Sequence, residues 1–209
     1  MAEPQRIVII GSGLAGAAAA GALRERGYTG DVVVFGREGH RPYELPALSK
    51  QVLLGDADEP DRVHEPEFYD THRIELRLGV EIVRVDVGGR VVEDSAGGSH
   101  SYDRLILATG STPRRLPVPG GELPGLRTLR TVEDSLALRR ELVDGAEVVI
   151  VGAGWIGCEV AAAARRHGAS VTVVDPVDLP LRRVLGPRMG EVFRDLHAEH
   201  GVIISRHPS

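Results

Sequence analysis

The chain has 209 residues and a formal net charge of −5, which argues against a protein that binds nucleic acid mainly through charge. Hydrophobic residues make up 42% and charged residues 26% of the sequence, a balance typical of a globular protein rather than a disordered one. Its single cysteine, Cys158, cannot form an internal disulfide, a Cys-x-x-Cys redox pair or a zinc knuckle. The start of the chain is too polar for a signal peptide, and no apolar run reaches about 18 residues. We therefore expect a soluble cytoplasmic protein that spans no membrane.

Glycine is frequent, with 26 residues, and it clusters where predicted strands lead into predicted helices. The apolar run 6–10 predicts a strand buried on both faces, the alanine-rich stretch 14–26 a helix, and residues 31–35 a second buried strand. The same βαβ order returns later, so we predict an α/β chain with two Rossmann-like, three-layer units built on parallel sheets, the second incomplete. The elements predicted for the second copy are strands at 148–151, 170–174 and 202–204, and helices at 160–167 and 187–199.

A stretch rich in proline and glycine, residues 111–125, separates the two copies. Such a composition predicts a linker. We therefore predict a first domain at residues 1–112, a linker at 113–125 and a second domain at 126–209. The remaining predicted elements are helices at 47–54, 67–72 and 131–143, a hairpin within 80–93 that turns at Gly88-Gly89, and a strand at 105–108.

The first glycine turn, from Gly11 to Gly16, follows the first predicted strand and has the pattern Gly-x-Gly-x-x-Gly. Its first glycine allows a tight turn, Gly13 lets a phosphate approach the backbone, and the third lets helix and strand pack closely. The N-terminus of the helix then faces the pyrophosphate of a dinucleotide. We expect the acidic side chain of Glu38, which follows Arg37, to bind the ribose hydroxyls. The alternative is a glycine-rich packing turn that binds no ligand.

The second glycine turn, residues 152–157, repeats this pattern, and Asp175 ends the strand that follows it. A carboxylate there favours NADH over NADPH because it repels a 2′-phosphate, although Arg182 and Arg183 lie close in sequence and oppose that preference. The alternative is a turn that has lost its ligand. Two such turns in one chain indicate two dinucleotides, and a flavin with a nicotinamide is the usual pair, because one donates hydride and the other accepts it.

Further segments resemble the FAD-dependent ferredoxin reductases of the pyridine nucleotide-disulfide oxidoreductase superfamily, which include putidaredoxin, rubredoxin and aromatic-dioxygenase ferredoxin reductases. Together with the first glycine turn they make five motifs in the right order, and the resemblance runs from Ile7 to about residue 204. The segments are 41–50 (RPYELPALSK), which resembles PY-x-x-P-x-L-S-K, 102–110 (YDRLILATG), which resembles YD-x-L-x-x-ATG, 129–134 (LRTVED), which resembles LRT-x-ED, and 154–159 (GWIGCE), which resembles G-(Tyr/Phe)-IG-x-E.

The resemblance implies an FAD site and a nicotinamide site, with Lys50, Trp155 and Glu159 as candidate catalytic residues. Lys50, the only lysine of the sequence, would lie near the flavin ring and stabilise negative charge on reduction. Trp155 would cover the nicotinamide face of the flavin, with core packing as the alternative, and Glu159 would lie near the nicotinamide and Lys50. Arg130 would neutralise the FAD pyrophosphate. The predicted cofactor contacts are Gly11, Gly13, Leu14, Ala15, Gly16, Arg37, Glu38, Lys50, Ile82, Ala108, Thr109, Gly110 and Arg130 for FAD, and Gly152, Gly154, Ile156, Gly157 and Asp175 for the nicotinamide dinucleotide.

The sequence departs from the family pattern at a few positions and in length. Leu45 and Ala47 stand where many members have arginine and proline, and Arg37 stands where an acidic residue is common. Family members are about twice as long, and their later segments complete the flavin site. We therefore expect the chain alone to be poor in FAD or self-associated.

The function that we predict is an FAD-dependent oxidoreductase that passes electrons from NADH through FAD to a ferredoxin-type [2Fe-2S] protein or rubredoxin, as part of a P450 or dioxygenase system. Dithiol chemistry is excluded unless a partner brings the thiols, because the 42–50 region has no cysteine. Two alternatives stay open, a truncated non-catalytic dinucleotide-binding module and an NAD-only dehydrogenase. We predict no metal site and no nucleic-acid partner.

Overall fold

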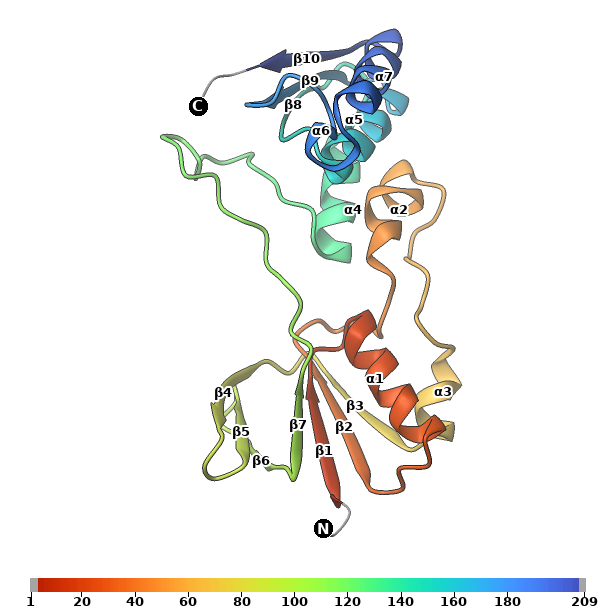
Figure 1. Cartoon of the computed structure of the whole chain (residues 1–209), viewed down its shortest axis with the longest axis vertical. Helices are drawn as coiled ribbons and strands as arrows, with labels where there is room; N and C mark the ends of the chain where they lie inside the picture. Colours follow the sequence, from red (N-terminus) through yellow and green to blue (C-terminus); the bar gives the residue numbers. More distant parts are fainter. Residues whose placement is uncertain (1–3, 207–209) are drawn as a thin grey trace. The chain divides into compact units, whose positions relative to one another are not determined.

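The computed structural model describes residues 4–206. These form two compact units (Figure 1). The first comprises residues 4–44 and Asp61–Thr112, and the second comprises Leu45–Pro60 and residues 113–206. The chain therefore leaves the first unit after Glu44, contributes a short segment to the second, and returns. Within the described residues, no helix combines the length and the apolar character that crossing a bilayer requires.

The first unit is built on a parallel four-stranded sheet with strand order β3-β2-β1-β7. β1 and β2 are buried on both faces, as their unbroken apolar sequences predict. One face packs against the helices through Ile9, Val34 and Tyr69. The other packs against a β-meander through Phe35 and Val92. The elements are β1 (Arg6–Ile10), α1 (Leu14–Glu25), β2 (Asp31–Gly36), α3 (Pro66–Thr71), β3 (Ile74–Leu78), β4 (Ile82–Asp86), β5 (Val91–Asp94), β6 (Ser99–Ser101) and β7 (Arg104–Leu107).

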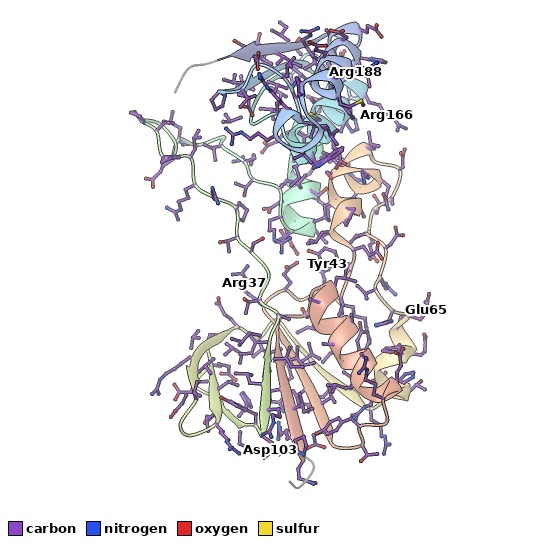
Figure 2. All side chains as sticks on the ribbon, viewed as in Figure 1. Arg37, Tyr43, Glu65, Asp103, Arg166 and Arg188 are labelled. Carbon is purple, nitrogen blue, oxygen red and sulfur yellow. The ribbon has the colours of Figure 1, made fainter. Side chains whose placement is uncertain are left out.

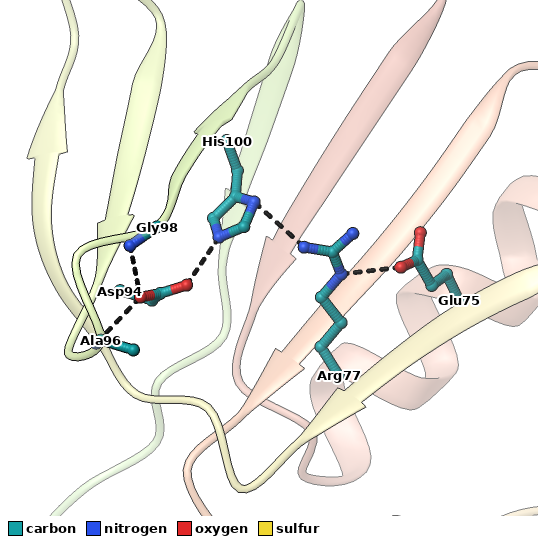
Figure 3. Close-up of polar contacts among 6 residues, drawn as sticks. All are labelled: Glu75, Arg77, Asp94, Ala96, Gly98 and His100. Atoms are coloured by element: carbon teal, nitrogen blue, oxygen red, sulfur yellow. Dashed lines mark hydrogen bonds and ion pairs between the residues drawn. The ribbon is translucent and has the colours of Figure 1, made fainter.

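A row of polar side chains joins the meander β4-β5-β6 to the parallel sheet (Figure 3). His100 of β6 lies between Asp94, whose Oδ2 is 2.8 Å from its Nε2, and Arg77 of β3, whose guanidinium is 3.0 Å from its Nδ1. Arg77 also donates to Glu75 at 2.7 Å. The arginine is a donor only and the carboxylate an acceptor, so the network assigns the proton of a neutral His100 to Nε2.

The second unit is built on a parallel three-stranded sheet with strand order β10-β9-β8. Its core combines residues of α5 and β9 with Leu142, which follows α4. Leu53, from the segment Leu45–Pro60, completes this core. The opposite side of the sheet carries exposed Val149, Val151 and Ile203. The elements are the 3-10 helix η1 (Leu45–Ser49), α2 (Gln51–Leu54), α4 (Val132–Glu141), β8 (Glu147–Val151), α5 (Trp155–Arg166), β9 (Ser170–Asp175), α6 (Arg182–Leu185), α7 (Pro187–Glu199) and β10 (Val202–Arg206).

The predicted fold class is confirmed, while several element boundaries differ from prediction. α5 begins at Trp155, directly after its N-cap Gly154, and not at residue 160. The low helix propensity of Gly157 does not delay the start of the helix. The predicted helix at 47–54 is split into η1 and α2. Strands β3 and β6 and helix α6 were not predicted. The predicted division into an FAD-binding domain that ends at residue 112 and a nicotinamide-binding domain that begins at residue 126 stays a prediction. Residues 45–60, which fall within the first predicted domain, lie in the second compact unit.

Candidate functional site

The first glycine turn joins β1 to α1, and its glycines serve different physical needs. Gly11 has a φ of +112°, and a side chain there would collide with the carbonyl of Ala108. A side chain on Gly16 would collide with the carbonyl of Gly11. In contrast, a Cβ on Gly13 would meet no atom within 4 Å. Packing therefore requires Gly11 and Gly16, whereas Gly13 keeps a space in front of the turn clear.

The N-terminus of α1 suits an anion. Its N-cap residue is Gly13, which supplies no side-chain cap, and its first turn contains no acidic residue. The leading backbone N–H groups of such a helix lack intrahelical partners and carry the positive end of the helix dipole. The following residues, Leu14 and Ala15, are exposed. The space next to Gly13 and these N–H groups together form a cradle that fits a pyrophosphate.

The second glycine turn, between β8 and α5, repeats this geometry. Gly152 has a φ of +107°, close to that of Gly11. Gly154 caps α5 with φ −81° and ψ −172°, and Gly13 caps α1 with φ −75° and ψ −174°. A Cβ on Gly154 would meet nothing within 4 Å, and one on Gly157 would collide with the Gly152 carbonyl. Both copies of the turn therefore offer the same open cradle.

The acidic candidate of the first unit, Glu38, is held by a neighbour. Tyr43 donates its hydroxyl to Glu38 Oε2 at 2.5 Å. The preceding residue, Arg37, points outward and lies 3.9 Å from Glu81, with more than half of its side chain exposed (Figure 2). Hydrogen bonding to Tyr43 leaves further acceptor sites on the Glu38 carboxylate, so a ribose contact stays a prediction.

The acidic candidate of the second unit, Asp175, braces the glycine turn. Its Oδ2 accepts from the backbone N–H of Ala153, and its Oδ1 accepts from that of Val177, both at 2.7 Å. Each carboxylate oxygen can accept a further hydrogen bond. Asp175 therefore has a structural role at the end of β9, and its predicted contact with ribose is compatible with that role.

Lys50 and Glu159, predicted to lie near each other, meet within the second unit. Lys50 precedes α2, and its Nζ lies 3.6 Å from Oε1 of Glu159 on α5. The other oxygen of Glu159, Oε2, accepts a hydrogen bond from the Ser49 hydroxyl at 2.5 Å. Sequence reasoning missed Ser49, although its place beside Lys50 in the motif was a signal.

The other predicted FAD contacts are divided between the two units. Ile82 begins β4 and packs against the meander core. Thr109 and Gly110 follow β7 and are exposed, and Gly110 has a φ of +67°. Ala108 is half-buried and donates its N–H to the carbonyl of Ile10. These residues belong to the first unit, whereas Lys50 and Arg130 belong to the second.

Trp155 and Ile156 begin α5 directly after the open Gly154 position. They are 48% and 55% exposed, and the Trp155 ring packs edge-on against Phe193. Core packing therefore accounts for only part of the Trp155 surface. Behind them, Cys158 is buried, and this burial raises the pKa of its thiol to about 11. At neutral pH the thiol stays protonated, which makes it a poor nucleophile.

Comparison with known proteins gives a family match over almost the whole chain. Residues 5–208 match the family described as pyridine nucleotide-disulphide oxidoreductase. The rhodocoxin reductase of Rhodococcus erythropolis is 45% identical over 197 residues, which cover 94% of this chain and 46% of that protein. The ferredoxin--NAD(+) reductase component of the biphenyl dioxygenase system of Paraburkholderia xenovorans (strain LB400) is 42% identical, covering 96% of this chain and 49% of the relative.

Solved structures agree with this match. A chain in the crystal structure of a covalent putidaredoxin reductase–putidaredoxin complex superimposes with a TM-score of 0.90 at 37% identity, over 97% of this chain and 49% of that one. A ferredoxin reductase for the CYP199A2 system from Rhodopseudomonas palustris gives a TM-score of 0.91 at 35% identity, over 97% and 50%. The chain thus spans about half the length of the relatives that it matches.

Proposed function

Because the chain belongs to the pyridine nucleotide-disulphide oxidoreductase family, we propose that it acts in an FAD-dependent oxidoreductase that passes electrons from NADH to a ferredoxin-type iron–sulfur protein or to rubredoxin. The observation that carries this proposal is the pair of equivalent cradles at Gly13 and Gly154, each open to a ligand and each at an uncapped helix N-terminus. One chain with two such cradles can hold a hydride donor and a hydride acceptor.

We assign the first cradle to FAD and the second to NADH. The first unit supplies Gly13, and Glu38 lies after the second strand, as expected for a ribose ligand. The second unit supplies Gly154 and Asp175 in the corresponding positions. FAD held at the Gly13 cradle would supply a hydride acceptor that can also give up electrons one at a time. Lys50 would place a cation near the flavin, and Asp175 would disfavour a 2′-phosphate.

The family name includes disulphide chemistry, which this chain's own thiol does not suit. Cys158 is the only cysteine in the sequence. It is buried on α5, where its sulfur contacts the carbonyl of Ala153, and burial raises the pKa of the thiol to about 11. An attacking thiol works best with a pKa near the ambient pH. The name of the ferredoxin--NAD(+) reductase relative therefore describes the proposed reaction better than the family name does.

Reconstitution with FAD tests the proposal. The purified chain is mixed with FAD at a concentration high enough to offset the weak flavin binding expected of the chain alone, and NADH is added without oxygen while the flavin absorbance is followed. We expect bleaching by NADH and, after addition of a [2Fe-2S] ferredoxin or of rubredoxin, reduction of one of these acceptors. In Gly154→Val, we expect FAD to be retained and bleaching by NADH to be lost. A chain that binds NADH and takes up no FAD would instead support a non-catalytic dinucleotide-binding module.

A further inference from the structure

Ser49 occupies an unusual position for a polar residue. It is only 7% exposed, and its hydroxyl is bonded to a carboxylate, Oε2 of Glu159. The second oxygen of the same carboxylate faces Lys50 at 3.6 Å. We propose that Ser49 is a positioning residue, which fixes the rotation of the Glu159 carboxylate and thereby holds a counter-ion beside Lys50. Any effect of this positioning on catalysis depends on the proposed function, whereas the positioning of Glu159 by Ser49 can be tested without it.

The ion pair needs such a partner because it is exposed. The side chains of Lys50 and Glu159 are 52% and 30% exposed. Exposed pairs between long side chains are weakly held, since water screens the attraction and ordering both chains costs entropy. A hydrogen bond to an ionised acceptor is stronger than one between neutral groups. The buried Ser49 hydroxyl thus orders one partner, Glu159, and leaves only Lys50 to be ordered by the ion pair.

Ser49 can position Glu159 because its own backbone is held. The neighbouring carbonyl of Leu48 accepts a hydrogen bond from the hydroxyl of Ser135, at 2.7 Å, and Ser135 is completely buried. Farther along, Arg139 donates to the carbonyl of Val52 at 3.2 Å. Both donors lie on α4, so these bonds fix η1 and α2 on that helix. A donor on such an anchored segment defines a direction for the carboxylate that it binds.

The position of the pair gives the orientation a consequence. Glu159 lies on α5, the helix whose N-terminus is the second cradle, and Lys50 is the residue proposed to face the flavin. A fixed Glu159 carboxylate keeps the ammonium of Lys50 in one position. The positive charge would then act on one defined part of the flavin. A freely rotating carboxylate would let Lys50 move into water. Ser49 would therefore control the placement of the charge without touching either cofactor.

The competing explanation is that the Ser49–Glu159 bond only attaches η1 to α5. A spectroscopic signal from Lys50 separates the two, because Lys50 is the only lysine of the sequence. Reductive methylation with ¹³C-formaldehyde labels Lys50 and the α-amino group, which give separate NMR signals, and the methylated lysine keeps its charge. The measurement needs neither FAD nor NADH, so its failure is distinguishable from failure of the proposed function.

Four variants form the experiment: Ser49→Ala, Ser49→Thr, Glu159→Gln and the double variant Ser49→Ala/Glu159→Gln. We expect Glu159→Gln to move the Lys50 signal and Ser49→Ala to move it at least roughly half as far in the same direction. Ser49→Thr, which keeps the hydroxyl, should restore the wild-type signal. The double variant should match Glu159→Gln, because Ser49 acts on Lys50 only through Glu159. Should Ser49→Ala fail to fold, Ser49→Cys carries the same test, since a thiol is a weak donor.

Ser135→Ala is the matched control. It removes a buried hydroxyl that anchors the same segment through the Leu48 carbonyl and leaves the Ser49–Glu159 bond itself in place, so we expect a lower melting temperature and a clearly smaller shift of the Lys50 signal than Ser49→Ala gives. An unchanged Lys50 signal in both Ser49→Ala and Ser49→Cys would overturn the proposal. Equal effects of Ser49→Ala in the wild-type and Glu159→Gln backgrounds would overturn it as well. If the signals behave as expected and the chain binds no FAD, the positioning role stands and the proposed function fails.

Discussion

Gly13 differs from the other glycines of its turn because only a ligand needs it. A Cβ there meets no protein atom within 4 Å, and its φ of −75° suits any residue. We therefore expect Gly13→Val to keep the fold while weakening FAD binding on the order of 10²-fold, because the side chain takes the space of the pyrophosphate. Titration with FAD, followed by flavin fluorescence, measures the loss, and thermal unfolding shows whether the fold persists.

Gly88→Val serves as the control for this substitution. Gly88 lies in the turn between β4 and β5, and a Cβ there makes an ordinary contact of 3.5 Å with Asp86. We expect this variant to bind FAD as the wild type does. Undiminished FAD binding by Gly13→Val would show that the first turn is not the flavin site.

Asp175 combines a structural and a predicted recognition role, and substitutions can separate them. Asp175→Ala removes the acceptor of two backbone N–H groups, which we expect to cost roughly 1–3 kcal/mol of unfolding free energy. It should also narrow the preference for NADH over NADPH, since the repulsive charge is lost. Asp175→Asn loses the charge but keeps an acceptor for one of the two N–H groups, so it should narrow the preference for NADH at a smaller cost in stability than Asp175→Ala. Equal use of both nucleotides by the wild type would contradict the assignment.

At the scale of single elements, α4 has a cap that stabilises it locally. The side chain of Thr131 accepts from the N–H of Asp134, and the Asp134 carboxylate accepts from the N–H of Thr131, which makes a capping box. We expect Thr131→Ala to lower the free energy of unfolding by about 1 kcal/mol, measured by urea denaturation. Thr128→Ala, at an exposed position outside any helix or strand, should change it much less. Equal losses in both variants would argue against a capping role.

The polar row under the meander should respond to acid (Figure 3). The hydrogen bond from His100, followed by that from the N–H of Gly98, holds the pKa of Asp94 below its usual value. A group whose pKa is lower in the folded state contributes stability above its unfolded pKa, about 3.9, and loses it as the pH falls through the folded value. We expect the wild type to lose stability below about pH 4 more steeply than Asp94→Asn, as followed by urea unfolding at several pH values.

The control for this comparison lies next to it in β5. Glu93 forms an ion pair with Arg84 at 2.8 Å, in which Arg84 is exposed and Glu93 is partly exposed. Such a solvent-exposed pair contributes little to stability. Glu93→Gln should therefore keep the steep loss of the wild type. Asp103, whose pKa is also lowered by backbone N–H groups, contributes equally to all three proteins. A wild-type slope in Asp94→Asn would show that the polar row does not bear on acid stability.

Patterns of period and composition predicted the repeated βαβ cores, since β1, β2, β8 and β9 are apolar runs next to glycine turns. They did not predict β6, because its sequence Ser-His-Ser has no apolar signature and pairs only with β5. The same patterns could not predict part of the candidate site, because they carry no information on contacts between residues far apart in sequence. The proximity of Lys50 and Glu159 was expected from a resemblance, but the hydroxyl of Ser49 is recognisable only once η1 and α5 are packed together.

At the scale of the whole molecule, the second unit is assembled from two separate stretches of chain. Leu45–Pro60 lies between two parts of the first unit in sequence and belongs to the second in space. It places the fully buried Leu53 in the core of the second unit, and the Leu53 carbonyl lies 2.9 Å from Nε2 of His167. Arg166 adds a pair of hydrogen bonds to Asp56. A complete second unit therefore requires residues from both sides of the linker.

This composition predicts how the chain behaves when it is cut. Between β7 and α4 the described chain has no helix or strand, so a break between Gly120 and Gly121 interrupts no element. We expect pieces 1–120 and 121–209, produced together with a tag on one of them, to purify as a complex, because the first piece supplies Leu53 and its segment to the core of the second. Leu53→Asp should separate them, since it places a charge in that core. The exposed Val83→Asp should not. If 121–209 folds cooperatively without 1–120, then Leu45–Pro60 packs on the surface of the second unit and is not needed for its folding. In that case Lys50 and Ser49 are not part of its stable core.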